Sequence, residues 1–404
     1  MTEKQLQACA GRLEEFLREL LGDLGRSERR EHGARYVQGL LLDGERKSIE
    51  PLAARVPGGN VQSLQQFVGQ SPWAWQPVRV QLAQRLQEAL LPLAGWIIDD
   101  TGFPKQGKES VGVARQYSGT LGKVGNCQIA VSIHLTTEQE SAPLDWALYL
   151  PQQWVDDPER CRKAGVPENA LFRSKPEMAL TLVDQLVRWG VSRLPVLADV
   201  AYGRSSEFRQ GLANRQLQYV VGVDPDTAIW TEPTRRVPPR RKSGRGRPPA
   251  PYYKDKPTNL EAMAKALPAS QWKRVRWREG SQGPQESRFL ARRIQPAHGH
   301  ARNQAELEEG WALIEWPSQE QAPTKYWFSN LPLRTSLKRL VGLAKLRWRV
   351  EQNYQQLKEE LGLDHYEGRG WSGWHHHVTL VCLAYAFLLL ERQRTKKNFT
   401  DDSA

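Results

Sequence analysis

Acidic residues stand at three places where a metal-dependent reaction could be carried out. Two of these places directly follow an apolar run: Asp99 and Asp100 come after WII, and Asp199 comes after PVLA. The third is Glu351, which lies within a long stretch of helical periodicity. Carboxylates without cysteine neighbours suit the hard cations Mg²⁺ and Mn²⁺. Two such ions, about 4 Å apart, can activate a nucleophile and stabilise the leaving oxygen of a phosphoryl transfer. Each acid alone could be a helix cap or a surface charge, but the set favours a metal site.

The apolar runs predict strands that end at Asp100 and Asp199, which is where α/β sheets bind ligands. Successive strand residues point to opposite faces, so Asp99 and Asp100 cannot both reach the same ions from a regular strand. Around Glu351, helical geometry places Arg347 about 40° away and Lys358 about 20° away, so the three share one face. That face is either a solvated ladder of charges or a surface on which Arg347 and Lys358 bind DNA phosphates beside Glu351.

The remaining patterns predict a mixed α/β protein. Residues 1 to about 90 have helical periodicity, and a Pro-Gly-Gly turn followed by Asn60, an expected N-cap, separates two short helices. This pair suits a helix-turn-helix DNA reader and an ordinary helical hairpin equally well. Strand-like runs begin at Trp96 and later alternate with helices. A long helix through Glu351, an apolar helix at 378–390 and a disordered polar tail at 395–404 are expected to complete the chain.

The composition favours a protein with a polyanionic partner. The 404 residues carry a formal charge of +12, from 57 basic and 45 acidic side chains. Four cysteines without CxxC spacing argue against a disulfide framework and a structural zinc site. No signal peptide is visible, and the longest apolar stretch is shorter than the roughly 20 residues that span a bilayer. We therefore expect a cytoplasmic protein with no membrane partner.

Four segments resemble a known family: RSERREHGARYVQGLLLDGERKSIEPLAARVPGGNVQSLQQF, IIDDTGFPKQGKESVGVARQYSGTLGKVGNCQIAVS, LADVAYG and RWRVEQNYQQLKEELGLDHYEGRGWSGWHHH. They resemble insertion-sequence transposases of the DDE superfamily, in particular the insertion-sequence 701 family, which is related to the insertion-sequence 4 group. The larger group has the signature Y-x2-R-x3-E-x6-K, which is matched by Arg347, Glu351 and Lys358, with Ala344 in place of the tyrosine.

The resemblance implies the catalytic residues and the fold. The family's first acid, in a D-x-[ST] pattern, maps to Asp99, and its second acid maps to Asp199. Together with Glu351, these residues would bind two Mg²⁺ ions, for which Mn²⁺ could substitute. The implied fold is an α/β, RNase H-like mixed sheet flanked by helices and interrupted by a β-rich insertion, with an N-terminal all-helical DNA-binding domain.

The spacing of the acids indicates where the insertion lies. Asp199 and Glu351 are 152 residues apart, far more than an unstructured loop in a compact domain. The runs KRVRWRE, SRFLARRI, WALIEW and KYWFSN predict four strands in this interval. Related transposases use such an insertion to hold end DNA and to place an aromatic ring against an unstacked base. The candidates, most of which we expect to be core residues, are Trp272, Trp277, Trp311, Trp316 and Trp327.

The expected organisation has five parts. They are a helical DNA-binding domain (1–90), the first part of the catalytic core (91–224), a basic loop with the β-rich insertion (225–332), the C-terminal helices of the core (333–394) and a polar tail (395–404).

Two further runs carry unusual side chains. Residues 235–247 contain seven basic residues and no acid, among them Arg241, Lys242, Arg245 and Arg247. The Arg-Gly-Arg-Pro sequence in this run resembles an AT-hook core, which binds the minor groove of DNA. We favour the interpretation that the run is a general phosphate-binding loop. For the run 375–377 of three histidines, we expect packing at a helix N-terminus, with one ring near the active site, rather than a shared metal ion.

The resemblance implies a DNA transposase that cuts transposon ends and joins the freed 3′-hydroxyl to target DNA. Its partners would be double-stranded DNA, at the transposon ends and the target, and a second copy of the chain in a dimeric DNA complex. Its location would be the bacterial cytoplasm, in association with the nucleoid. Two alternatives are a structure-specific metal nuclease without strand transfer and a domesticated DNA-binding protein without cleavage. The intact acids count against the second alternative.

Overall fold

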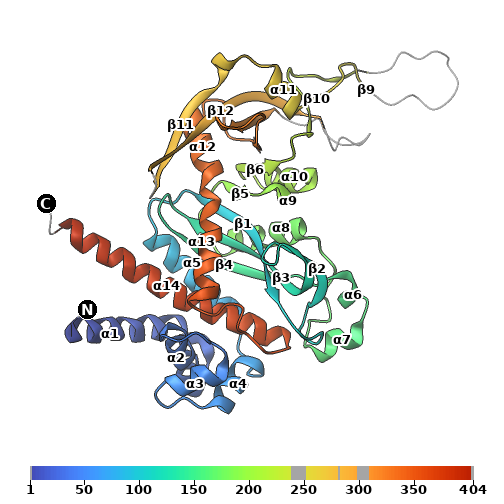
Figure 1. The fold of residues 1–404 in the computed structure, drawn as a ribbon. Coiled ribbons are helices and arrows are strands. Elements are labelled where there is room, and N and C mark those ends of the chain that lie inside the picture. The colour runs from blue at the N-terminus through green and yellow to red at the C-terminus, as the bar shows by residue number, and fades with distance from the viewer. Residues whose placement is uncertain (1, 238–251, 281–282, 298–308, 402–404) are drawn as a thin grey trace. The chain divides into compact units, whose positions relative to one another are not determined.

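The computed structural model describes residues 2–237, 252–280, 283–297 and 309–401 (Figure 1). The chain divides into two compact units. The first unit contains residues 1–93, 98–192 and 349–404, and the second contains residues 94–97 and 193–348. The chain therefore passes from one unit to the other four times.

The first unit begins with the helices that the sequence predicts. They are α1 (Glu3–Leu20), the short 3-10 turn η1 (Gly22–Leu24), α2 (Ser27–Leu41), α3 (Ile49–Arg55), α4 (Val61–Gly69) and α5 (Trp75–Ala89). The expected cap of α4 is confirmed, because the Asn60 side chain accepts a hydrogen bond of 2.9 Å from the Ser63 amide. These helices belong to the same compact unit as residues 98–192 and 349–404.

The strands of the first unit form an antiparallel arrangement covered by helices. They are β1 (Gly95–Pro104, whose first residues belong to the second unit), β2 (Ala114–Ser118), β3 (Lys123–Thr136) and β4 (Ser141–Leu148), and β3 pairs antiparallel with both β2 and β4. The helices α6 (Gln152–Val155), α7 (Pro158–Lys163) and α8 (Lys175–Arg188) follow. A capping box between Ser174 and Glu177, with a proline in the first turn, fixes the start of α8.

The last helix, α14 (Trp371–Asp401), completes the first unit. It packs against α2, α4, α5 and β4, and in Figure 1 it lies in red along the blue N-terminal helices. Its length and composition would allow it to cross a membrane, but 89% of its most apolar window is buried within the protein. Packing therefore accounts for its apolar surface. The helix continues to Asp401, into the segment for which we expected a disordered tail.

The second unit contains most of the strands. They are β5 (Val196–Ala198), β6 (Tyr219–Val223), β7 (Ala228–Trp230), β8 (Arg236–Val237), β9 (Tyr252–Tyr253), β10 (Thr258–Asn259), β11 (Lys273–Gly280), β12 (Gly283–Pro296), β13 (Gly310–Trp316) and β14 (Lys325–Ser329). Its helices are α9 (Val200–Gly203), α10 (Ser206–Asn214), α11 (Leu260–Ala266), the 3-10 turn η2 (Ala269–Gln271) and α12 (Leu337–Leu346). The β5–β6 pair is parallel and its neighbours are antiparallel, so the sheet is mixed.

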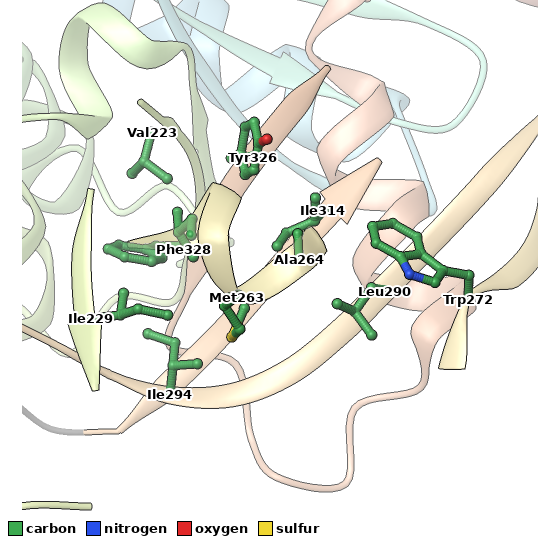
Figure 2. Packing of buried hydrophobic residues seen from close by; sticks show 12 residues of the cluster. Val223, Ile229, Met263, Ala264, Trp272, Leu290, Ile294, Ile314, Tyr326 and Phe328 are labelled. Carbon is green, nitrogen blue, oxygen red and sulfur yellow. The ribbon is translucent and has the colours of Figure 1, made fainter. Parts of the chain in front are cut away.

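The four strands expected in the insertion are present as β11 to β14. They do not form a separate sheet, because β14 pairs with β6 and β13, and β12 pairs with β11, β13 and β7. The insertion therefore extends the sheet that starts with β5 and β6. Figure 2 shows the core beneath it, in which Met263 and Ala264 of α11 face Ile229, Leu290 and Ile294 of the strands.

One prediction about the helices is wrong. The stretch expected to form one long helix is divided into α12 and α13 (Trp348–Glu359), with Arg347 between them. The apolar periodicity continues through the break, as Leu343 and Leu346 are buried before it and Val350 and Leu357 after it. The break coincides with the passage from the second unit to the first, so the two halves pack in different cores.

Candidate active site

The middle of strand β1 carries two adjacent carboxylates, because the strand continues to Pro104 and the prediction that it ends at Asp100 is wrong. Asp99 and Asp100 are both partly exposed, whereas the three residues before them and Thr101 after them are buried. The Asp99 side chain accepts a hydrogen bond of 2.9 Å from the Asp100 amide, which orients its carboxylate. On a strand, these two side chains point to opposite faces.

Asp100 points towards helix α8. Its Oδ2 lies 2.7 Å from the Nζ of Lys175, the first residue of that helix, and the two side chains are only 19% and 31% exposed. This carboxylate is therefore neutralised by an ammonium group from the same unit.

Asp99 lies on the other face of β1, with Thr101 and Phe103. The Thr101 hydroxyl lies 3.5 Å from the Thr120 hydroxyl, which accepts a 3.1 Å hydrogen bond from Lys358 Nζ of α13. The same ammonium donates to the Gly102 carbonyl at 2.8 Å and lies 5.6 Å from the centre of the Phe103 ring. The face that carries Asp99 is therefore the face that meets α13.

Helix α13 is also fixed to strand β3. The Tyr354 hydroxyl lies 2.7 Å from the Ser132 hydroxyl, and Asn353 Oδ1 lies 3.0 Å from His134 Nδ1. Glu351 stands one turn before these anchors, with an exposed side chain.

Asp99 and Glu351 lie at similar distances from the point where Lys358 contacts β1. Seven helical residues place Glu351 about 10 Å before Lys358 on the same face of α13. Asp99 lies about 10–13 Å along β1 from Gly102 and Phe103.

Asp199 belongs to the second unit. It follows β5 and serves as the N-cap of α9, where its Oδ1 accepts hydrogen bonds from the amides of Ala201 (2.9 Å) and Tyr202 (3.4 Å). The turn is tight, because a side chain at Gly203 would overlap the Gly222 carbonyl of β6. The structure thus confirms the expected place of Asp199 directly after a buried strand.

The signature residues are divided by the helix break. Glu351 and Lys358 lie on α13, whereas Arg347 lies at the junction and belongs to the second unit. Ala344, at the position of the signature tyrosine, is buried on α12. Burial lowers the pKa of Lys358, and the nearby Asp364 partly opposes this shift.

Comparison with known proteins identifies the family. Residues 19–284, more than half of the chain, match a protein family described as "DDE superfamily endonuclease". The chain belongs to the DDE superfamily of endonucleases. Asp99 and Asp199 lie inside the matched residues, and Glu351 lies beyond them.

Two further similarities accompany this match. This DDE endonuclease is 32% identical over 204 residues to the "Probable transposase for insertion sequence element IS701" of Microchaete diplosiphon, which covers 49% of the chain and 50% of the relative. The chain thus matches about half the length of that relative, and the expected resemblance to the insertion-sequence 701 family is confirmed. A cryo-EM structure of a piggyBac transposase synaptic complex with hairpin DNA is similar at 12% identity and a TM-score of 0.41, covering 80% of this chain and 52% of that one.

The three acids of this DDE endonuclease belong to two different units of the chain. Among the described residues, no group of three or more His, Cys, Asp or Glu side chains is placed to hold a metal ion. The first unit supplies Asp99 and Glu351, and the second supplies Asp199. The predicted DNA-binding residues Arg241, Lys242, Arg245 and Arg247 lie outside the described residues.

The candidate tryptophans of the insertion differ in burial. Trp272 and Trp327 are buried in the core, so two of the five are core residues, whereas we expected most of them to be. The other three, Trp277, Trp311 and Trp316, are partly exposed and lie near a cation from the same unit: Lys345, Arg293 and Arg288 respectively.

The three histidines pack at the start of α14, as expected. His376 contacts the carbonyls of Val68 and Trp73 at 2.8 and 2.9 Å, and His377 contacts the Tyr36 hydroxyl at 2.9 Å. Burial lowers the pKa of His376 and of His377 to about 4. These buried rings join α14 to the N-terminal helices.

Sequence reasoning missed Lys175 and Thr120, whose side chains contact β1 at Asp100 and at Thr101 and Gly102. The capping box of α8 is visible in the sequence SKPE, but nothing local shows that its lysine meets Asp100, 75 residues earlier. Thr120 lies in the turn between β2 and β3, and its contacts with Thr101 and Lys358 likewise form only in the folded chain.

Proposed function

We propose that the chain is a DNA transposase that cuts transposon ends and joins them to target DNA by two-metal phosphoryl transfer. Membership of the DDE superfamily and the similarity to a probable insertion-sequence transposase support this proposal. The observation that carries it is the placement of Asp99 on the face of β1 that meets α13, the helix of Glu351. We also propose that the sheet is RNase H-like.

The residues fit divalent cations. Asp99, Asp199 and Glu351 offer oxygen donors, and backbone amides hold the side chains of Asp99, within β1, and of Asp199, directly after β5. Two Mg²⁺ ions, or Mn²⁺ in their place, would lower the pKa of the attacking water or hydroxyl and stabilise the leaving oxygen. The chain's own part is to hold the carboxylates rigidly and to keep Asp100 paired with Lys175.

We propose that cationic side chains around this site bind DNA. Arg347 and Lys358 would contact phosphates near the scissile bond, and residues 235–247, with Arg241, Lys242, Arg245 and Arg247, would bind the backbone elsewhere. Helices α3 and α4, joined by a tight turn, are proposed to read transposon-end sequence. The assembly would be a homodimer that pairs two ends in the bacterial cytoplasm.

The decisive experiment is single-turnover cleavage of duplexes that carry the element's ends, in Mg²⁺. Asp99→Asn, Asp199→Asn and Glu351→Gln should each lower cleavage by at least about 10³-fold while end binding survives, because each removes an oxygen ligand. Asp100→Asn is the matched control and should retain most of the activity.

Substantial cleavage by one of the three variants would remove that residue from the site. Cleavage without joining by the wild-type protein would favour a nuclease, and binding without cleavage would favour a domesticated DNA-binding protein.

A further inference from the structure

The strand that carries Asp99 carries a second carboxylate, and the first unit gives that carboxylate a partner of its own. We propose that Lys175 is a positioning residue that holds Asp100 away from the metal site, so that Asp99 alone serves as the ligand from β1. The proposal rests on the proposed function, because it concerns how the acids of that site are selected.

The geometry of the pair is well defined. Lys175 Nζ lies 2.7 Å from Asp100 Oδ2, on the face of β1 opposite to the face that meets α13. Lys175 is the first residue of α8, so its backbone is fixed by the capping box of Ser174 and Glu177. Further along α8, Met178 is among the buried residues that anchor the helix in the core.

The pair also acts on Asp99 through the backbone. The Asp100 amide donates the 2.9 Å hydrogen bond that orients the Asp99 carboxylate, so a rotation of residue 100 would move that donor. An ammonium group holding the Asp100 side chain therefore stabilises the backbone geometry that Asp99 requires.

Electrostatics gives the same result. Without its ammonium partner, the Asp100 carboxylate would attract a divalent cation to its own face of β1, and a cation bound there would not be available to the face that meets α13. Lys175 cancels the charge of Asp100 within a partly buried contact, so the cation has only one carboxylate of β1 to bind. A lysine 75 residues away thus resolves an ambiguity that is built into the Asp-Asp sequence.

A double-mutant cycle tests the proposal through metal binding as well as activity. The proteins are wild type, Lys175→Met, Asp100→Asn and the double variant, with Lys175→Arg as the conservative replacement. Lys396→Met is the matched control, since it removes another 2.7 Å lysine–carboxylate pair, with Glu140, in the same unit. Mn²⁺ binding is followed by electron paramagnetic resonance, and Mg²⁺-dependent single-turnover cleavage is measured in parallel.

We expect Lys175→Met to bind Mn²⁺ with altered affinity or an additional site and to cleave about 10–100-fold more slowly, the loss that is typical when an outer-shell contact of a metal site is removed. Adding Asp100→Asn should return both measurements to those of Asp100→Asn alone, and Lys175→Arg should resemble wild type. Lys396→Met should change neither.

A Lys175→Met defect that Asp100→Asn does not correct would overturn the proposal, since Lys175 would then act on something other than Asp100. Unchanged Mn²⁺ binding and cleavage in Lys175→Met would overturn it as well. Failure of the proposed function has a different signature: wild type that does not cleave, or Asp99→Asn that cleaves normally. In that case the Mn²⁺ titrations still decide whether Lys175 controls which carboxylate binds the metal.

Discussion

Two runs of adjacent titratable residues in the first unit have opposite environments. At the start of α14, His375, His376 and His377 are 4%, 0% and 0% exposed, and their rings contact helices or carbonyls of the same unit. In the middle of β1, Asp99 and Asp100 remain partly exposed, and Asp100 forms an ion pair with Lys175. Residue type alone would make either run a metal-site candidate. Burial separates them: the histidines join elements, and the acids are left accessible for chemistry.

The largest effect on stability is expected at the histidine end. Arg79 of α5 is 2% exposed, and its guanidinium donates to Asp145 and Thr379 at 2.8 Å and to the His375 carbonyl at 3.1 Å. Arg79→Met leaves Asp145 buried without its cation, so the free energy of unfolding in urea should fall by about 3–5 kcal/mol.

A second change should sharpen this result. Asp145→Asn in the Arg79→Met background removes the unpaired charge and keeps an oxygen for the Trp146 amide, so part of the stability should return. Cleavage per folded molecule should stay near wild type in both variants. A wild-type urea transition in Arg79→Met would show that this network does not join the helices to the strands.

The next effect is a loss of stability in acid. Burial lowers the pKa of His377 to about 4 from the 6.5 expected in the unfolded chain, so the unfolded state binds the proton first as pH falls. The stabilisation is complete above pH 6.5 and is lost towards pH 4, at up to about 1.4 kcal/mol per pH unit for this ring. Urea unfolding at pH 7, 6 and 5 should show the decline, and His377→Gln should make it shallower. An identical pH slope in that variant would mean that this ring is not protected from protonation.

The smallest stability effects are expected near the acids, where the functional effects should be large. Lys358→Ala removes an ammonium bound to Gly102 and Thr120, so unfolding free energy should fall by about 1–2 kcal/mol. Arg347→Ala, at the partly buried helix junction, should lower it by about 1 kcal/mol. Cleavage should fall by about 10²-fold or more in both, because the scissile phosphate would lose its position. Normal cleavage with normal melting would remove these residues from the site and weaken the assignment of Glu351.

Local patterns were sufficient for much of the fold. Helical periodicity predicts the N-terminal helices, and residues such as Asn60 and Ser205 mark helix starts because their side chains satisfy the first free amides. The break at Arg347 was not predictable, because the apolar spacing continues through it and only the packing of the two halves in different units divides the helix. The pairing of β14 with β6 has no local signal either.

The candidate site was predictable in its acids but not in their partners. The period of a strand separates Asp99 from Asp100 in advance, and the apolar run before Asp199 places it at a strand end. The contacts of Lys175 and Lys358 with β1 join residues that are 75 and 256 positions apart. No periodicity relates such positions, so only the folded chain reveals which lysine meets which strand.

The position of α14 has a consequence for the synthesis of the protein. Helices α2, α4 and α5 leave the ribosome early, but the helix against which they pack begins only at Trp371. At about 5–20 residues per second, the nascent chain waits tens of seconds with these apolar faces uncovered. The first unit can therefore close only after α14 has been synthesised, so a chain terminated before Trp371 would lack a completed core and would be a substrate for chaperones and proteases.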